Sequence, residues 1–181
     1  VHTDALTFAW EGLKGASWRV VGNLPYNVAS PLMWEFVSRA EWERAVFMVQ
    51  KEVGERLVAA PGSKAYGALS VWIQTFADVR MEFIVGPQVF RPRPKVDSAV
   101  LSFAKKQEIP DKALSTALNG LVSRCFQQRR KQLQKILKDS GREAVTTWLE
   151  EKGLPPTARP ENLSPRAFVQ LAFSLKNGFA S

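Results

Sequence analysis

The sequence predicts an α/β region with a mostly parallel sheet, followed by an all-helical region. In about the first hundred residues, short apolar runs alternate with amphipathic segments, which is typical of strands alternating with helices. From about residue 107 onward the apolar residues recur only at helical spacing, and Gly- and Pro-containing stretches separate the segments. We therefore predict one domain over residues 1–107 and a second over residues 108–181.

The composition is that of a globular protein. Its 181 residues are 45% hydrophobic and 23% charged, and no apolar run is long enough to cross a bilayer. The first residues, VHTDALTF, do not form a signal peptide, and Cys125 is the only cysteine. We expect a cytoplasmic protein, because an internal disulfide is impossible and a single cysteine fits a reducing compartment. We also expect no membrane partner.

The α/β region begins with a short buried strand over residues 18–25 that runs into a loop. A helix over 30–40 follows, with Ser30 as its cap and Pro31 at its first helical position. The continuous apolar run over 45–50 is typical of a central parallel strand. The remaining expected elements are helices over 51–59 and 66–77, and strands over 79–86 and 98–105 on either side of the Pro-rich stretch 86–97.

Four helices are expected in the second region. Gly141, Gly153 and the stretch PPTARPENLS punctuate it. The helical segments cover residues 110–126, 127–141, 142–153 and 164–176.

The net charge of +8 comes from 25 basic and 17 acidic residues. Residues 105–138 hold nine Lys or Arg and two acidic residues, so this segment alone carries +7. Clustered positive charge favours an anionic partner, with nucleic acid first and an acidic membrane second. The alternative is a charge that only keeps the protein soluble.

Part of this charge falls at helical spacing. Arg124, Lys131 and Lys138 lie seven residues apart, and Lys135 lies four after Lys131. If one nearly continuous helix covers them, they form a basic stripe. A break at residues 127–130 would split the stripe.

The usual catalytic groups are scarce in this chain. His2 is the only histidine, the acidic residues form no obvious pair, and no Cys/His cluster has zinc spacing. Cys125 falls on an apolar helix face, where we expect it to pack rather than react. We expect no metal site, and any catalysis must use backbone carbonyls, amides and aromatic faces.

The stretch GNLPY offers such groups at the end of the first strand. Loops beyond the carboxyl ends of parallel strands are where α/β proteins bind ligands. There Asn23 offers an amide oxygen, Leu24 a carbonyl and Tyr26 a ring face, while Pro25 fixes the direction of the chain. Two acceptors and a ring suit adenine, whose amino group has two N–H donors. An ordinary surface turn is the alternative for the same residues.

An adenine amino nitrogen is a poor nucleophile, because its lone pair is delocalised into the ring. Acceptors placed out of the ring plane would favour a pyramidal nitrogen, which could then attack the methyl group of a sulfonium. Catalysis would consist of positioning and electrostatic stabilisation, on a base that is unpaired or flipped out.

Seven stretches in order resemble the KsgA/RsmA family of ribosomal RNA adenine dimethyltransferases, which is related to the Erm resistance methylases. The resemblance covers almost the whole chain. It implies S-adenosylmethionine as methyl donor, and two adjacent adenines near the 3′ end of small-subunit (16S) rRNA as substrate. It also implies the C-terminal half of a Rossmann-like methyltransferase sheet, followed by a small helical RNA-binding domain. The stretches are DAL, GNLPYNVASPL, FMVQKEVGERL, PGSKAYGALSV, VFRPRPKVDSAVLSF, CFQQRRKQL and RPENLSPRAF.

By this resemblance Asn23 and the Leu24 carbonyl would hold the target amino group, with Asn23 also near the methionine part of the donor. Tyr26 would stack on the base, and Phe90 would close its other face. Without the resemblance, Phe90 is equally a core residue at the end of a strand.

Asp4, with Ala5 beside it, would contact the adenine of the methyl donor, although Asp4 alone is an ordinary surface or capping residue. Small-subunit rRNA in the 30S ribosomal subunit is the expected partner. Surface solvation is the default for each basic side chain. The expected RNA contacts are Lys95, Arg124, Arg129, Arg130, Lys131 and Lys135.

The family also has a Gly-rich loop and an acidic ribose-binding residue on its first strand–helix units, and this sequence has neither. A βαβ unit takes about 30 residues or more, so we expect a fragment that lacks about 60–90 residues. We expect it to bind S-adenosylmethionine weakly or not at all and to be inactive alone. An exposed strand of its sheet would favour dimerisation.

Two other functions stay open. One is a non-catalytic RNA-binding or ribosome-assembly module, and the other is an Erm-type methyltransferase of 23S rRNA. The stretch RPENLSPRAF and the long helical tail favour the ribosome-biogenesis branch of the family and disfavour a DNA adenine methylase.

Overall fold

The structure is a computed structural model that describes residues 2–12 and 17–176. The chain divides into two compact units, of which one comprises residues 1–59 with 76–108 and the other residues 60–75 with 109–181. This grouping differs from the predicted boundary in residues 60–75. The division into domains at residue 107 stays a prediction.

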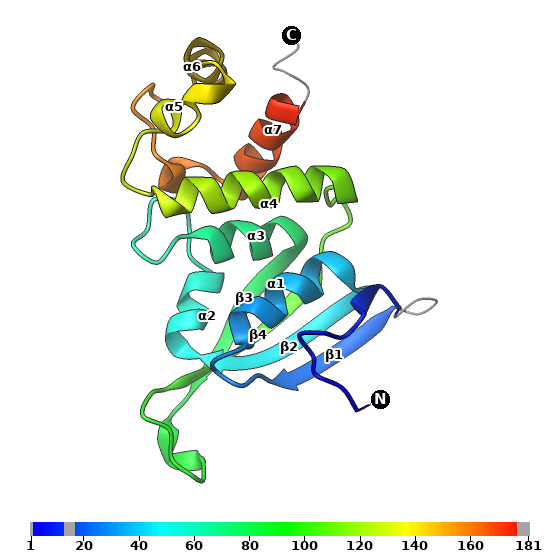
Figure 1. The fold of residues 1–181 in the computed structure, drawn as a ribbon. Helices are drawn as coiled ribbons and strands as arrows, with labels where there is room; N and C mark the ends of the chain where they lie inside the picture. The colour runs from blue at the N-terminus through cyan, green and yellow to red at the C-terminus, as the bar shows by residue number, and fades with distance from the viewer. Residues whose placement is uncertain (1, 13–16, 177–181) are drawn as a thin grey trace. The chain divides into compact units, whose positions relative to one another are not determined.

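A four-stranded mixed sheet forms the first unit (Figure 1). Its strand order is β1-β2-β4-β3, so β1 and β3 are the edges of the described sheet. Strand β1 runs parallel to β2, while β4 runs antiparallel to both β2 and β3. Dimerisation through an exposed edge stays a prediction. The strands are β1 (Trp18–Asn23), β2 (Trp42–Gln50), β3 (Ala77–Val85) and β4 (Ser98–Lys105).

The prediction of a mostly parallel sheet was therefore wrong for the described strands. The Pro-rich segment 86–97 between β3 and β4 holds only the 3₁₀ turn η2 (Pro87–Val89). Parallel neighbours need a long crossover connection, usually a helix, whereas a short connection leaves the strands antiparallel. The absence of a helical pattern in 86–97 was the sequence signal for this arrangement.

Helix α1 (Ala29–Arg39) begins one residue earlier than predicted, and Ser30 is not its cap. The N-cap is Val28, which makes no side-chain capping bond. Instead the Pro25 carbonyl accepts hydrogen bonds from the N–H groups of Val28 and Ala29, at 3.1 and 3.0 Å. The segment after β1 is thus already coiled when it reaches Ser30, which leaves this serine within the first turn.

One face of the sheet forms the core of the first unit. Alternate residues of β2 and β4 point to this face and are buried, as the period of a strand requires. Phe36 of α1 packs its ring edge-on against Phe47 of β2, with ring centroids 5.5 Å apart. The buried strand residues are Ala45, Phe47, Val49, Ala99, Leu101 and Phe103.

Helix α2 (Lys51–Leu57) approaches the same sheet through Gly54. A Cβ atom at this position would lie only 3.0 Å from the Cβ of Ala99 and 3.3 Å from a methyl of Leu101. A larger residue would push the helix away from β4, so the glycine permits the close approach.

The second unit is helical. Helix α4 begins after Asp111, whose carboxylate accepts the Leu114 N–H at 2.7 Å, and it packs against α7. The ring of Phe126 contacts those of Tyr66 and Phe168. The helices are α3 (Ala68–Phe76, whose last residue belongs to the first unit), α4 (Lys112–Gln127), α5 (Leu133–Ile136), α6 (Arg142–Glu151) and α7 (Pro165–Lys176), with the 3₁₀ turns η3 (Lys138–Ser140) and η4 (Pro160–Asn162). A further 3₁₀ turn, η1 (Trp10–Gly12), lies in the first unit.

The predicted helix over residues 127–141 is broken, and the continuous basic stripe was wrong. Helix α4 ends at Gln127, and the Lys131 N–H donates to the Gln128 carbonyl in a turn. The Leu133 N–H then bonds the carbonyl of Ala158 at 2.9 Å, which ties the start of α5 to a distant segment. Arg124 and Lys131 therefore do not lie on one helix.

Replacing Phe36 by Ala should destabilise the first unit. The ring is 1% exposed and contacts the rings of Trp10, Trp42 and Phe47. Its loss should lower the free energy of unfolding by about 3–5 kcal/mol in urea titrations. The same change at Phe83, which is 59% exposed on β3, should cost less than about 1 kcal/mol. Equal losses would contradict this account of the core.

Candidate functional site

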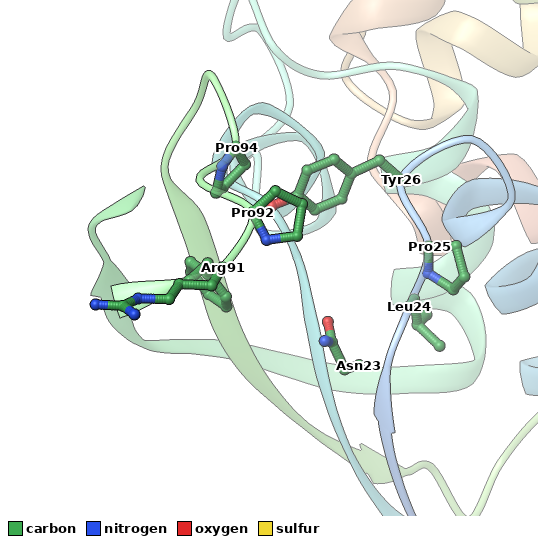
Figure 2. Close-up of a pocket in the computed structure, with 8 residues that line it drawn as sticks. Asn23, Leu24, Pro25, Tyr26, Arg91, Pro92 and Pro94 are labelled. Carbon is green, nitrogen blue, oxygen red and sulfur yellow. The ribbon is translucent and has the colours of Figure 1, made fainter. Parts of the chain in front are cut away.

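A pocket of about 300 Å³ lies in the first unit, where β1 ends. Two chain segments form it: the end of β1 with the loop before α1, and the loop between β3 and β4 (Figure 2). All five residues for which we predicted a role at the reacting base line this pocket together. The lining residues are Asn23, Leu24, Pro25, Tyr26, Phe90, Arg91, Pro92 and Pro94.

The strand ladder places two hydrogen-bond acceptors at the pocket. The Leu24 N–H donates to the Met48 carbonyl at 3.0 Å, which continues the parallel pairing of β1 with β2, and the Leu24 side chain is buried. Because side chains alternate along a strand, Asn23 is exposed and extends into the space between the two segments (Figure 2). Among the described residues, neither the Asn23 amide nor the Leu24 carbonyl has a hydrogen-bond partner. Both acceptors are available to a ligand.

The Tyr26 side chain lines the pocket, and its hydroxyl end is held by a hydrogen bond. It is half-buried, and its phenol oxygen lies 2.9 Å from the Ser98 hydroxyl oxygen. Pro25 precedes it and carries the carbonyl that starts the coil toward α1. The Tyr26 ring therefore remains on a surface that a flat ligand can reach. The Asn23 side-chain amide is likewise not turned into the protein interior.

The facing segment belongs to the β3–β4 loop. Phe90 is half-buried, and its N–H donates to the Pro87 carbonyl at 3.3 Å, which closes η2. The Arg91–Pro92 peptide is cis, and the Arg91 guanidinium extends away from the pocket (Figure 2). In this loop we predicted roles only for Phe90 and Lys95. No role was predicted for Arg91, Pro92, Pro94 or Ser98.

Asp4 and Ala5 lie outside this pocket, in an exposed turn of the first unit. One carboxylate oxygen of Asp4 accepts the Leu6 N–H at 2.9 Å, and the Asp4 carbonyl accepts the Thr7 N–H at 3.1 Å. The carboxylate is therefore oriented by its own turn. Its other oxygen has no partner among the residues that the structure describes, which fits a ligand bearing an amino group.

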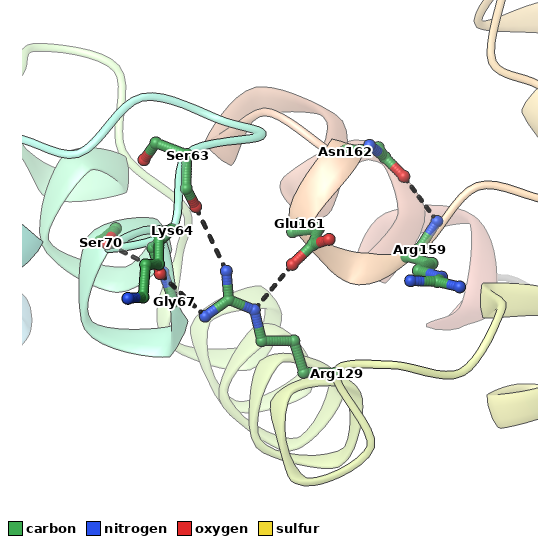
Figure 3. Close-up of polar contacts among 8 residues, drawn as sticks. All are labelled: Ser63, Lys64, Gly67, Ser70, Arg129, Arg159, Glu161 and Asn162. Atoms are coloured by element: carbon green, nitrogen blue, oxygen red, sulfur yellow. Dashed lines mark hydrogen bonds and ion pairs between the residues drawn. The ribbon is translucent and has the colours of Figure 1, made fainter.

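Arg129, a predicted RNA contact, is held within the second unit (Figure 3). Its guanidinium donates to Glu161 at 2.7 Å, to the Lys64 carbonyl at 3.0 Å and to the Ser63 carbonyl at 3.2 Å. These bonds join residues 60–75 to the segment around η4. The side chain thus has a structural role, and an RNA contact by Arg129 stays a prediction.

The other predicted RNA contacts differ in how free they are. Arg124 pairs with Asp139 at 2.8 Å, and the Lys131 amine donates to the Gln128 side chain at 3.0 Å. Lys95, Arg130 and Lys135 are exposed and have no ion-pair partner among the described residues; Lys95 belongs to the first unit and the other two to the second.

Among the residues that the structure describes, three titratable groups have displaced pKa values, and none of the three lines the pocket. Burial raises the pKa of the Cys125 thiol to about 12, with Arg124 acting in the opposite direction. Burial also raises the pKa of the Tyr66 phenol, whose hydroxyl donates to the Leu163 carbonyl at 2.7 Å. The pKa of the Lys105 amine is lowered by burial, against the effect of nearby Glu41. Cys125 is fully buried and packs in the core, as predicted.

Two kinds of feature are missing from the part of the chain that the structure describes. Every helix there is too short or too polar to span a bilayer. Within residues 2–12 and 17–176, no three His, Cys, Asp or Glu side chains gather as a metal site would require.

Comparison with known sequences gives a consistent result. The sequence model of the family described as "Ribosomal RNA adenine dimethylase" matches residues 1–177. The "Ribosomal RNA small subunit methyltransferase A" of Oleidesulfovibrio alaskensis is 60% identical over 100% of this chain and 65% of its own length. The protein of that name from Geobacter metallireducens is 42% identical over 95% of this chain and 66% of its own length. The chain thus spans about 65% of the length of such relatives.

Solved structures show the same fold. A dimethyladenosine transferase from Plasmodium falciparum superposes with a TM-score of 0.75 at 24% identity, covering 99% of this chain and 72% of that one. The 23S rRNA methyltransferase ErmE superposes with a TM-score of 0.69 at 23% identity, covering 97% and 71%. The prediction of a Rossmann-like α/β sheet followed by helices is confirmed.

Replacing Arg129 by Lys should destabilise the second unit although the charge is kept. A lysine ammonium cannot reproduce the three directed bonds of the guanidinium, so the free energy of unfolding should fall by about 1–3 kcal/mol. Urea unfolding measures it. Arg130→Lys is the matched control, because Arg130 is exposed, and it should change stability by less than about 0.5 kcal/mol. Equal effects at both positions would show that the Arg129 contacts contribute nothing.

Proposed function

The chain belongs to the ribosomal RNA adenine dimethylase family, and we propose that its pocket binds the adenine that such an enzyme methylates. The proposed reaction is dimethylation of the N6 amino groups of two adjacent adenines near the 3′ end of small-subunit rRNA, with S-adenosylmethionine as methyl donor. One observation carries the proposal: two unpartnered acceptors, on Asn23 and Leu24, stand in a pocket that Tyr26 and Phe90 also line.

The acceptors act on the amino group of the base. Adenine N6 has two N–H donors, one for the Asn23 side-chain oxygen and one for the Leu24 carbonyl. Acceptors out of the ring plane draw the two N–H bonds from that plane and localise the nitrogen lone pair. They also stabilise the positive charge that would develop on nitrogen as the new C–N bond forms and the sulfur–methyl bond of the donor breaks to leave a neutral thioether, which is electrostatic catalysis by preorganised groups. The extra proton then leaves for water.

The aromatic side chains hold the ring of the base. Stacking on an aromatic ring contributes about 1–3 kcal/mol per base and tolerates any sequence. With Tyr26 on one side and Phe90 on the other, the base is fixed as a flat plate while its amino group meets the acceptors. A base stacked within an RNA double helix cannot reach such a pocket, so the substrate adenine must be unpaired or flipped out.

S-adenosylmethionine, when bound, supplies the electrophilic methyl group. The residues that would hold it are Asp4 and Ala5 at its adenine and Asn23 at its methionine part. The free oxygen of the Asp4 carboxylate fits the adenine amino group, and the Asn23 amide offers both a donor and an acceptor. Weak binding of this donor by the chain alone stays a prediction, which titration calorimetry can test.

Exposed cations on both units fit an RNA partner in the 30S subunit. They are Lys95, Arg130, Lys131 and Lys135. Fold similarity to ErmE alone would equally allow a 23S substrate. The 41–60% identity to proteins named for the small subunit supports the small-subunit substrate instead.

Replacing Asn23 by Ala tests the reaction most simply. Loss of one preorganised acceptor should lower turnover on undermethylated small subunits by about 10²–10³, while RNA affinity changes little. The variant is made in the protein as its gene encodes it. Asn27→Ala is the matched control, since Asn27 is exposed in the same turn and does not line the pocket.

Unchanged turnover in Asn23→Ala would mean that the amide is not at the reacting amine. Absence of methyl transfer by the wild-type protein would favour the non-catalytic RNA-binding module. Methylation of large subunits in place of small ones would favour the Erm-type reaction.

A double Lys131→Ala, Lys135→Ala variant should weaken RNA binding and flatten its salt dependence. Each phosphate contact contributes about 0.7–0.9 to the slope of log K against log salt, so two contacts should reduce it by about 1.4–1.8. A Lys152→Ala, Lys176→Ala variant changes the net charge equally and should leave most of the slope intact. Equal slopes in the two variants would argue against phosphate contact at Lys131 and Lys135.

A further inference from the structure

Ser98 is a buried residue with no role in the site so far. It is the first residue of β4 and is 1% exposed. The sheet holds it on both sides, because it pairs with Gln50, the last residue of β2, and with Val85, the last residue of β3. Its hydroxyl oxygen lies 2.9 Å from the phenol oxygen of Tyr26, and it makes no other hydrogen bond among the described residues. A buried hydroxyl is strongly disfavoured without a partner, so this pair should persist.

We infer that Ser98 is a positioning residue, which holds the Tyr26 ring in place as one wall of the base pocket; the inference rests on the proposed function. The Tyr26 backbone belongs to the coil that the Pro25 carbonyl starts. From there the ring is placed by two side-chain torsions. The phenol oxygen lies on the ring axis, so holding this oxygen fixes the direction of the axis.

The hydrogen bond also connects the two walls of the pocket. Tyr26 belongs to the loop after β1, whereas Phe90 belongs to the loop that ends at Ser98. Pairing with β2 and β3 fixes Ser98 in the sheet. The hydrogen bond therefore fixes the position of the Tyr26 ring relative to β4, the strand at which the Phe90 loop ends. Because the reacting geometry tolerates only small displacements, a ring released from this contact should lower the rate more than the affinity.

The same contact defines what Tyr26 contributes. Its phenol oxygen is held beside the Ser98 hydroxyl, so the part of the side chain that it presents to the ligand is the ring face. Removing the hydroxyl from either residue should therefore have one and the same effect. This is the property that a double-mutant cycle measures.

The test compares Ser98→Ala, Tyr26→Phe and the double variant in the protein as its gene encodes it. Each single variant should lower kcat about three- to tenfold, the range expected for one lost neutral hydrogen bond, with the RNA KM nearly unchanged. The double variant should be no slower than either single variant. Single variants with wild-type kcat, or a double variant whose loss is the product of the two, would overturn the inference.

A binding measurement reports the ring without the reaction. The probe is a single-stranded RNA of pyrimidines with one 2-aminopurine, whose fluorescence falls when the base stacks. This base lacks the 6-amino group, so the signal reports stacking on the rings and not the bonds to Asn23 and Leu24. Ser98→Ala and Tyr26→Phe should both weaken this quenching at saturating protein. Ser98→Thr keeps a hydroxyl and should restore it; if the added methyl prevents folding, the double-mutant cycle still decides.

Two further variants separate the possible failures. Tyr66→Phe also removes a buried tyrosine hydroxyl, but in the second unit, so it should lower Tm without changing kcat or quenching. Tyr26→Ala removes the ring itself and should abolish both signals. If Tyr26→Ala has no effect, the proposed function fails. If Tyr26→Ala abolishes both signals while Ser98→Ala matches the wild type, only the role of Ser98 is overturned.

Discussion

The site depends on one backbone hydrogen bond, from the Leu24 N–H to the Met48 carbonyl at 3.0 Å. This bond extends the β1–β2 pairing one residue past the end of β1. Leu24 is also held by its side chain, which is buried. Strand alternation then leaves the Asn23 amide exposed. The next residue, Pro25, cannot continue the ladder because it has no N–H. The two acceptors are therefore presented by the rigid end of a strand rather than by a flexible loop.

The mixed sheet brings the second half of the pocket to the same place. β1 and β2 run parallel, so both strands terminate at the same end of the sheet. β4 runs antiparallel to β2, so its first residue, Ser98, lies beside Gln50 at that end of the sheet. The loop that carries Phe90 consequently ends next to the loop that carries Tyr26, and the 2.9 Å contact between Tyr26 and Ser98 links them. In a fully parallel sheet, β4 would instead begin at the opposite end of the sheet.

Local patterns in the sequence predicted the strand before GNLPY, most helices and the grouping of Asn23, Leu24, Pro25 and Tyr26, whereas the role of Phe90 was implied only by the family resemblance. They failed where distant contacts decide. After the break at Gln127, the next helix starts where the Leu133 N–H bonds the remote Ala158 carbonyl, a contact that no periodicity records. Residues 60–75 join the helical unit through the Arg129 contacts with the Ser63 and Lys64 carbonyls, again over a long separation. The antiparallel β4 was predictable, because no helix pattern precedes it.

A crystal structure of the protein with adenosine monophosphate tests the central claim most directly. The base should lie between the rings of Tyr26 and Phe90, with its amino nitrogen about 3 Å from both the Asn23 side-chain oxygen and the Leu24 carbonyl oxygen. No base between these two rings, or a base bound there with its amino group directed away from these two oxygens, would contradict the account.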